Sequence, residues 1–251
     1  MMVHFVGAGP GAPDLITVRG QGLLQAAGMV IYAGSLVNPA LLKNCKNGCR
    51  LYDSAGMTLD EVIAQMVEGQ ALGLDVVRLH TGDPAIYGAV REQMDALDRL
   101  GIAHQSVPGV SSFLAAAAAL SAEFTLPGVS QTLILTRMEG RTAVPTRESI
   151  RKLAEIGASM AIFLSLGVID ALVAELRAGY GQNVAVAVVY KASWDDQLIL
   201  KGHLDTIAAE VKAAGISRTA LVLVGNFLES DYELSKLYDA AFSHGFRNAV
   251  Q

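Results

Sequence analysis

The sequence has little of what several common protein classes need. Charged residues make up 17% of the 251, the formal net charge is −5, and no run of lysine or arginine occurs. The clustered cations that bind nucleic-acid phosphates are therefore missing. Residues 101–122 carry no charged side chain, but His104, Pro108 and several serines interrupt them, so no long apolar run exists. We expect neither a nucleic acid nor a membrane as a partner.

Cysteine is also scarce. Cys45 and Cys49 have no second pair that would complete a zinc site, so we expect free thiols in a reducing compartment and no metal. The first residues reach glycines without a positively charged stretch, which predicts no signal peptide and favours the cytoplasm. A hydrophobic content of 52% excludes intrinsic disorder and is enough for a substantial core.

The first half of the chain predicts an α/β domain over residues 1–120, with a mostly parallel sheet. Short apolar runs that end in glycine or polar residues are typical of buried strands, and they occur at 3–6, 29–32, 75–80 and 103–107. Helical spacing predicts helices at 17–27, 86–100 and 111–120, and Thr58 and Glu61 form a capping box that opens another.

A cluster of Ser, Glu, Thr, Pro and Gly near residues 121–130 indicates a linker, so we place a second α/β domain at 121–251. Its predicted strands are 132–136, 160–165, 184–190, 197–201 and 220–224, and its helices are 148–156, 169–177 and 204–214. Strands 184–190 and 197–201 have no helix-length insert between them, so they should pair as a hairpin in a mixed sheet. A cleft between two domains is the expected ligand site.

A glycine loop, Val6-Gly7-Ala8-Gly9-Pro10-Gly11, directly follows the first strand. Glycines at that position allow a sharp turn and a close approach of a ligand to the backbone. A dinucleotide loop is one interpretation, but Pro10 removes an N–H donor, the spacing differs from GxGxxG, and no acidic residue ends the strand at 29–32. A simple tight turn is the other interpretation.

Two more strand ends carry polar residues. Thr81-Gly82-Asp83-Pro84 follows the strand at 75–80, and Pro108-Gly109-Val110-Ser111-Ser112 follows the strand at 103–107. Asp83 alone could simply cap the next helix. However, parallel strands bring their carboxyl ends to one edge of the sheet, where open α/β folds bind ligands. Together the three loops predict a binding site there.

These three motifs, in this order and spacing, resemble those of the class III S-adenosylmethionine-dependent methyltransferases, the tetrapyrrole methylase family. The second half adds further matches at Thr136-Arg137, at residues 161–164, at Trp194-Asp195-Asp196-Gln197 and at residues 220–225. The resemblance covers about residues 3–228. It implies the two-domain tetrapyrrole methylase fold, with S-adenosylmethionine as methyl donor and S-adenosylhomocysteine as product.

Within that family, Tyr32-Ala33-Gly34-Ser35-Leu36-Val37 looks like the members that methylate C11 of precorrin-4, giving precorrin-5 in cobalamin biosynthesis. Members acting on uroporphyrinogen III have an Asp where this chain has Ala33, and a Lys-Arg segment where it has residues 53–56. A metal-free and a cobalt-containing substrate both stay open. The resemblance also implies a homodimer.

The resemblance implies a set of site residues. The expected contacts to the methyl donor are Pro10, Thr81, Gly82, Asp83, Ile86, Ser111, Ser112, Leu164, Ala192 and Ala220. Pro10 would also border the substrate. Cations near the loop ends, which could bind the substrate's carboxylates, are Arg78, Arg137, Arg141 and Lys191.

No firm catalytic residue follows from the sequence, because methylation of an already substituted C11 releases no proton from that carbon. Candidates that could influence the chemistry are His80, Asp83, Tyr87 and Glu123, whereas His4, His104, His203 and His244 are expected to be structural or solvated. Three alternatives remain: a sister methyltransferase acting at another ring carbon, a nucleotide-linked oxidoreductase, and a non-catalytic binder of S-adenosylmethionine.

Overall fold

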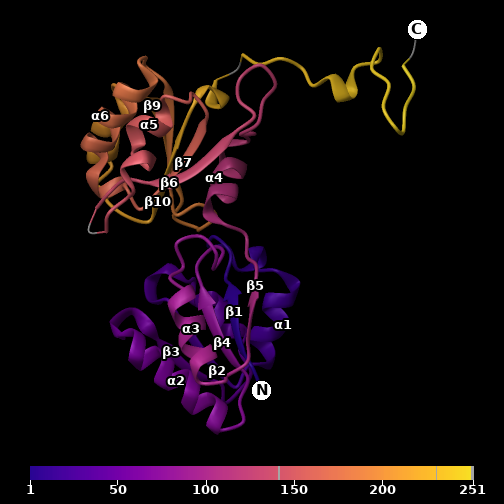
Figure 1. Ribbon diagram of the computed structural model, residues 1–251, viewed down its shortest axis with the longest axis vertical. Helices are drawn as coiled ribbons and strands as arrows, with labels where there is room; N and C mark the ends of the chain where they lie inside the picture. The colour runs from indigo at the N-terminus through magenta and orange to yellow at the C-terminus, as the bar shows by residue number, and fades with distance from the viewer. Residues whose placement is uncertain (141, 230, 250–251) are drawn as a thin grey trace. The chain divides into compact units, whose positions relative to one another are not determined.

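The computed structural model describes residues 1–140, 142–229 and 231–249 (Figure 1). The chain forms two compact units. The first contains Met1–Ala119 together with Lys191–Gln197, and the second contains Leu120–Tyr190 and Leu198–Gln251. The sequence placed the boundary after residue 120 and kept 191–197 with the second half. The predicted cleft between two domains stays a prediction.

The first unit is built on a five-stranded sheet in the order β3-β2-β4-β1-β5, and all its pairings are parallel. The strands are β1 (Val3–Gly7), β2 (Met29–Tyr32), β3 (Arg50–Asp53), β4 (Val76–His80) and β5 (His104–Val107). This confirms the predicted parallel sheet. The sequence missed β3, because this edge strand is mostly exposed and therefore has no run of apolar residues.

Helices cover the first sheet in two layers (Figure 1). On its faces lie α1 (Val18–Ala26), α2 (Leu59–Ala71) and α3 (Arg91–Arg99), and the chain continues after β5 into α4 (Ser112–Leu120). Neighbouring residues of β4 point to opposite faces, so Val77 packs with Leu24 of α1 in one apolar core and Val76 packs with Met66 of α2 in another. The predicted capping box of Thr58 and Glu61 is present at the start of α2.

Helix α3 begins at Arg91, five residues later than the sequence predicted. Tyr87 and Ala89 have left-handed backbone angles, φ 55° and 49°, which no helix interior allows. Gly88 lies close to the backbone of Pro84, because a Cβ on Gly88 would be 2.2 Å from the Pro84 carbonyl oxygen. Residues 84–90 therefore form a tight loop at the end of β4 instead of the first turns of a helix.

The second unit has a mixed five-stranded sheet in the order β6-β7-β10-β8-β9. Its strands are β6 (Leu133–Arg137), β7 (Ser159–Phe163), β8 (Ala185–Tyr190), β9 (Leu198–His203) and β10 (Ala220–Val224), and its helices are α5 (Ile150–Ala154), α6 (Ile169–Tyr180) and α7 (Ile207–Ala213). Among the strand pairs of the described residues in this unit, β6–β7 is the parallel one, and β8 and β9 form the predicted antiparallel hairpin. The α/β class with one parallel and one mixed sheet is confirmed.

Among the described residues, no helix is both long and apolar enough to cross a bilayer. In the same part of the chain, no three His, Cys, Asp or Glu side chains gather as ligands of a metal ion would.

Candidate functional site

Three loops meet at the carboxyl end of the parallel sheet. They are the glycine loop (residues 7–11) after β1, the aspartate loop (residues 81–90) after β4, and the serine loop (residues 108–112) after β5. The first two are joined through their backbones: Gly82 N–H donates to the Gly9 carbonyl over 2.8 Å, and Gly9 N–H donates to the Gly82 carbonyl over 3.3 Å. The predicted convergence of three strand ends is thus present.

Glycine is required where the loops touch. A Cβ on Gly7 would be 2.5 Å from the Gly109 Cα, and a Cβ on Gly109 would be 2.2 Å from the Gly82 carbonyl oxygen. Gly82 also has a left-handed φ of 60°, which side chains disfavour. The three backbones therefore form one surface, with side chains kept out of the contact.

The Asp83 carboxylate ties two of the loops together. Its Oδ1 accepts from Ala85 N–H over 2.8 Å, and its Oδ2 accepts from Gly109 N–H over 2.9 Å. It does not cap α3, which begins eight residues later. Charge-assisted bonds to backbone donors are stronger than neutral ones, so the carboxylate fixes the aspartate loop against the serine loop.

The segment Lys191–Gln197, called here the strap, packs against the glycine loop. Trp194 Nε1–H donates to the Pro10 carbonyl over 3.0 Å, and the Ser193 hydroxyl accepts from Ala12 N–H over 3.0 Å. Asn38 Nδ2–H donates to the Gly11 carbonyl over 2.9 Å. Trp194 lay in a segment singled out by family resemblance, but nothing in the sequence signalled that it contacts the glycine loop.

The predicted contacts to the methyl donor fall into two sets. Those in the first unit lie on the three loops and the strap: Pro10, Thr81, Gly82, Asp83, Ile86, Ser111, Ser112 and Ala192. Ala220 begins β10 of the second unit, and Leu164 directly follows β7. Leu164 is 76% exposed and has φ 54°. Strained conformations of non-glycine residues occur mostly where the surrounding structure or a function requires them.

The buried position of Arg78 argues against a contact between this residue and the substrate. The residue is only 7% exposed, its Nε–H donates to Gln93 Oε1 over 3.2 Å, and its Nη1–H donates to the Ile31 carbonyl over 3.3 Å. Alternation along β4 turns this side chain into the sheet face that α2 and α3 cover, which corrects the expectation that it reaches the loop end.

The other predicted cations also have protein partners. Arg137 donates to the carbonyls of Met138, Thr142 and Ala143 over 3.3, 3.1 and 2.9 Å, and so holds the loop that follows β6. Lys191 pairs with Asp196 at 2.5 Å and lies over the Trp194 ring. Arg141 lies outside the described residues.

His80 is buried at the end of β4, with 4% exposure, and stacks on Phe5 with ring centroids 6.1 Å apart. Its Nε2 has no hydrogen-bond partner. Burial, with a smaller contribution from the Arg78 charge, lowers the pKa of His80 from 6.5 to about 3. The imidazole is therefore neutral at physiological pH, beneath the aspartate loop.

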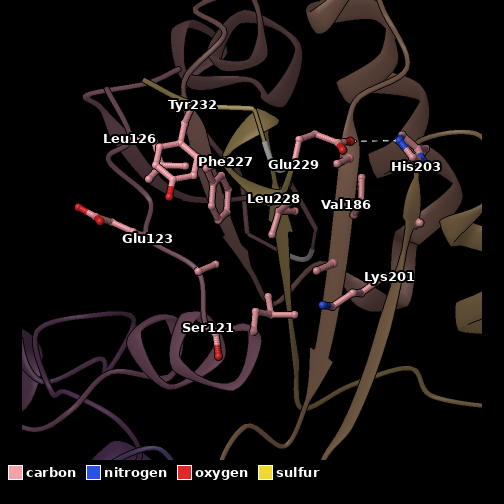
Figure 2. A pocket seen from close by; sticks show the side chains of 15 residues that line it. Ser121, Glu123, Leu126, Val186, Lys201, His203, Phe227, Leu228, Glu229 and Tyr232 are labelled. Carbon is pink, nitrogen blue, oxygen red and sulfur yellow. Dashed lines mark ion pairs between the residues drawn. The ribbon is translucent and has the colours of Figure 1, made fainter. Parts of the chain in front are cut away.

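A cavity of about 650 Å³ lies in the second unit (Figure 2). Strands β8 and β9 form one wall, and residues from the segment after α4 and from the segment after β10 form the others. The His203 Nε2 lies 3.3 Å from the Glu229 Oε1, and the Glu229 and Lys201 side chains contribute charge to the lining. Glu123 lines this cavity, which includes none of the ten predicted contacts to the methyl donor.

The first α/β unit has three loops that touch at the carboxyl end of a parallel sheet, which is where open α/β folds bind small ligands. A family model for tetrapyrrole (corrin/porphyrin) methylases matches residues 2–208. The chain belongs to that family.

Two relatives and two solved structures add detail. The chain is 51% identical to a cobalt-precorrin-4 C(11)-methyltransferase of Methanocaldococcus jannaschii, over 98% of this chain and 96% of that protein. It is 48% identical to a precorrin-4 C(11)-methyltransferase of a Sinorhizobium species, over 98% of each. The structure of a cobalt precorrin-4 methyltransferase superposes with a TM-score of 0.88 at 44% identity, covering 91% of this chain and 96% of that one.

The second solved structure holds a ligand. It is a uroporphyrin-III C-methyltransferase from Thermus thermophilus complexed with S-adenosylhomocysteine, with a TM-score of 0.75 at 25% identity. It covers 91% of this chain and 94% of that one.

Acid should destabilise the protein through His80. The folded pKa is about 3 and the unfolded one 6.5, so the unfolded chain takes up the proton first as the pH falls. The contribution of His80 to stability is complete above about pH 6.5 and falls by about 1.4 kcal/mol for each pH unit between there and about pH 3. Urea unfolding at stepped pH measures this slope. His80→Phe, which removes the titrating imidazole, should flatten it; an unchanged slope would contradict the assignment.

Proposed function

We propose that this protein transfers the methyl group of S-adenosylmethionine to C11 of precorrin-4, giving precorrin-5. The observation that carries the proposal is identity of about one half over nearly the whole chain to relatives named for that reaction. Since one of the two is named for the cobalt form and the other is not, the metal content of the substrate stays open. The Tyr32-Ala33-Gly34 segment supports the same assignment.

The three loops fit a sulfonium donor better than a pyrophosphate cofactor. None of the loops contains Lys or Arg, and the charge that they do carry is the Asp83 carboxylate. A pyrophosphate would meet a negative charge with no cation on the loops to offset it, which disfavours a nucleotide-linked oxidoreductase. The backbone groups of the loops, with Leu164, Ala192 and Ala220, are the proposed contacts to the donor.

For this methyl transfer, the main task of the protein is to position the donor and the substrate. The bound donor supplies a methyl group that is already activated on its sulfonium. The loops would hold its methyl in line with C11 and keep water away, since orientation and desolvation lower such barriers. A base is optional, because no proton leaves the carbon that is methylated. Among the candidates, Asp83 is committed to backbone donors and His80 is buried, while Tyr87 is 45% exposed on the aspartate loop, where a large substrate can reach it.

The decisive experiment is a product assay. The purified protein is incubated with isotope-labelled S-adenosylmethionine and either precorrin-4 or its cobalt form, and mass spectrometry and NMR then locate the label. We expect one added methyl, at C11. A methyl at another carbon would identify a sister enzyme. Tight S-adenosylhomocysteine binding without turnover on either form would identify a non-catalytic binder.

Asp83 should be essential for binding the methyl donor. Asp83→Ala removes the acceptor that holds the aspartate loop to Gly109 and the acceptor for Ala85 N–H within the loop, so we expect S-adenosylhomocysteine affinity to fall about 10- to 100-fold. Asp83→Asn should also bind weakly, because an amide NH₂ cannot accept from a second backbone donor. Titration calorimetry measures both. Asp205→Ala, at an exposed aspartate of the second unit, is the control; equal affinities in all three folded variants would refute the role.

Arg137 is the proposed contact to a substrate carboxylate. A guanidinium has five donors, so its three bonds to loop carbonyls do not exhaust it. Arg137→Met should raise the substrate KM about 10-fold or more and leave S-adenosylhomocysteine affinity unchanged, and Arg137→Lys should restore part of the loss. The wild-type KM should rise with salt. A KM that stays at the wild-type value, or a parallel loss of donor affinity, would rule the contact out.

We also propose that the protein works as a homodimer in the cytoplasm. Large apolar side chains of the C-terminal segment are exposed, among them Leu234 at 82%, Tyr238 at 81% and Phe246 at 100%. We propose that a second copy of this chain packs against these exposed apolar residues. Sedimentation at micromolar concentration should give a species of twice 26.4 kDa, and a single 26.4 kDa species would exclude the dimer.

A further inference from the structure

The strap Lys191–Gln197 is a rigid turn with its own internal bonds. The chain leaves β8 at Tyr190 and enters β9 at Leu198. Between them, Trp194 N–H donates to the Lys191 carbonyl over 3.0 Å, Gln197 N–H donates to the Trp194 carbonyl over 3.1 Å, and Ser193 N–H donates to Gln197 Oε1 over 2.8 Å. Lys191 and Ser193 have positive φ angles of 45° and 70°. Strain of this kind persists where the surrounding contacts over-determine the conformation.

The strap holds the glycine loop at two adjacent points. Trp194 donates to the Pro10 carbonyl, and Ser193 accepts from Ala12 N–H, each over 3.0 Å. Between these points the fit is tight, because a Cβ on Gly11 would be 2.0 Å from the indole Cδ1 of Trp194. The Asn38 amide binds the Gly11 carbonyl as well. Residues 10–12 are thus fixed by directional bonds from side chains.

The glycine loop is bonded to the aspartate loop, which is bonded in turn to the serine loop. Gly9 and Gly82 are paired through their backbones, and Asp83, next in the chain, accepts from Gly109 N–H. A displacement of Pro10 would therefore displace the aspartate loop, and through it the serine loop. All of these contacts lie within one compact unit.

We propose that Trp194 and Ser193 are positioning residues for the methyl-donor site, acting through the glycine loop. This inference rests on the proposed function, since it takes the three loops as the donor site. The indole N–H and the hydroxyl set the place of residues 10–12, and the backbone pairs carry that placement to Asp83. Gly11 is glycine because the indole occupies the space that a side chain would need.

The test uses variants that remove single groups. Trp194→Phe keeps an aromatic ring and deletes the N–H donor, and Ser193→Ala deletes the acceptor. Each should weaken S-adenosylhomocysteine binding about 3- to 10-fold in calorimetry, the range of one hydrogen bond. Gly11→Ala should weaken it further, and Gly11→Ala combined with Trp194→Ala should bind no worse than Trp194→Ala alone. Gly22→Ala is the matched control, because a Cβ there meets nothing within 4 Å.

Two readouts separate positioning from a merely structural role. Amide hydrogen exchange at Ala12 without ligand should speed up in Ser193→Ala and Trp194→Phe, while the exchange of the β8 amides stays unchanged. The chain has a single tryptophan, so Trp194 emission reports on the strap directly. In the wild type it should change on addition of S-adenosylhomocysteine, with the same midpoint as the calorimetric titration.

Failure of the two proposals can be told apart. A wild type that binds no S-adenosylhomocysteine overturns the proposed function, and the exchange at Ala12 then still decides whether the strap orders the loop. A wild type that binds, with Trp194→Phe and Ser193→Ala at wild-type affinity and wild-type Ala12 exchange, overturns the positioning role. Loss of thermal stability alone, without a change in affinity, overturns it too.

Discussion

The candidate site depends on the contact of three loop backbones at the end of the parallel sheet. Gly7, Gly82 and Gly109 approach so closely that a single methyl group at Gly7 or Gly109 would collide with backbone atoms. Close approach alone is not directional, because van der Waals contacts allow sliding. The Asp83 carboxylate supplies direction by accepting from the backbone on both sides. Steric fit and charge-assisted bonds thus hold the loops in one arrangement before any ligand binds.

A buried polar chain supports the aspartate loop from inside the sheet. Arg78 bonds to the Ile31 carbonyl and to Gln93, and Gln93 Nε2–H donates to the Ala89 carbonyl over 2.9 Å. Burial lowers the pKa of Arg78 to about 10, which still leaves it protonated at neutral pH. A buried charge needs such partners, since an unpaired one is costly. Arg78, which we expected to contact the substrate, therefore lies beneath the aspartate loop. Through Gln93 it helps to hold the strained segment around Ala89.

The sequence predicted those features that local patterns encode. Short apolar runs located nine of the ten strands in the described residues, and the Thr58 capping box located a helix start, because both signals lie within a few neighbouring residues. The late start of α3 was missed, since the strain at Tyr87 comes from packing and leaves no mark in composition. The burial of Arg78 was missed for a related reason. Its polar partner, Gln93, lies on a helix fifteen residues away, so no local pattern indicated that the Arg78 side chain is buried.

Of the seven non-glycine residues with positive φ in the described part of the chain, five belong to segments assigned to the proposed site, and Ser121 and Thr219 do not. Tyr87 and Ala89 lie on the aspartate loop, Lys191 and Ser193 on the strap, and Leu164 among the predicted contacts to the donor. Each such conformation costs on the order of 1–3 kcal/mol, so several of them lower the stability of the fold. Two are held by visible bonds: Ala89 through Gln93, and Ser193 through Gln197 and Ala12. Leu164 is different, because its side chain is 76% exposed and burial in the core does not hold its backbone in this conformation. Its strain agrees with the proposal that it contacts the methyl donor, since strained conformations cluster at ligand-binding sites.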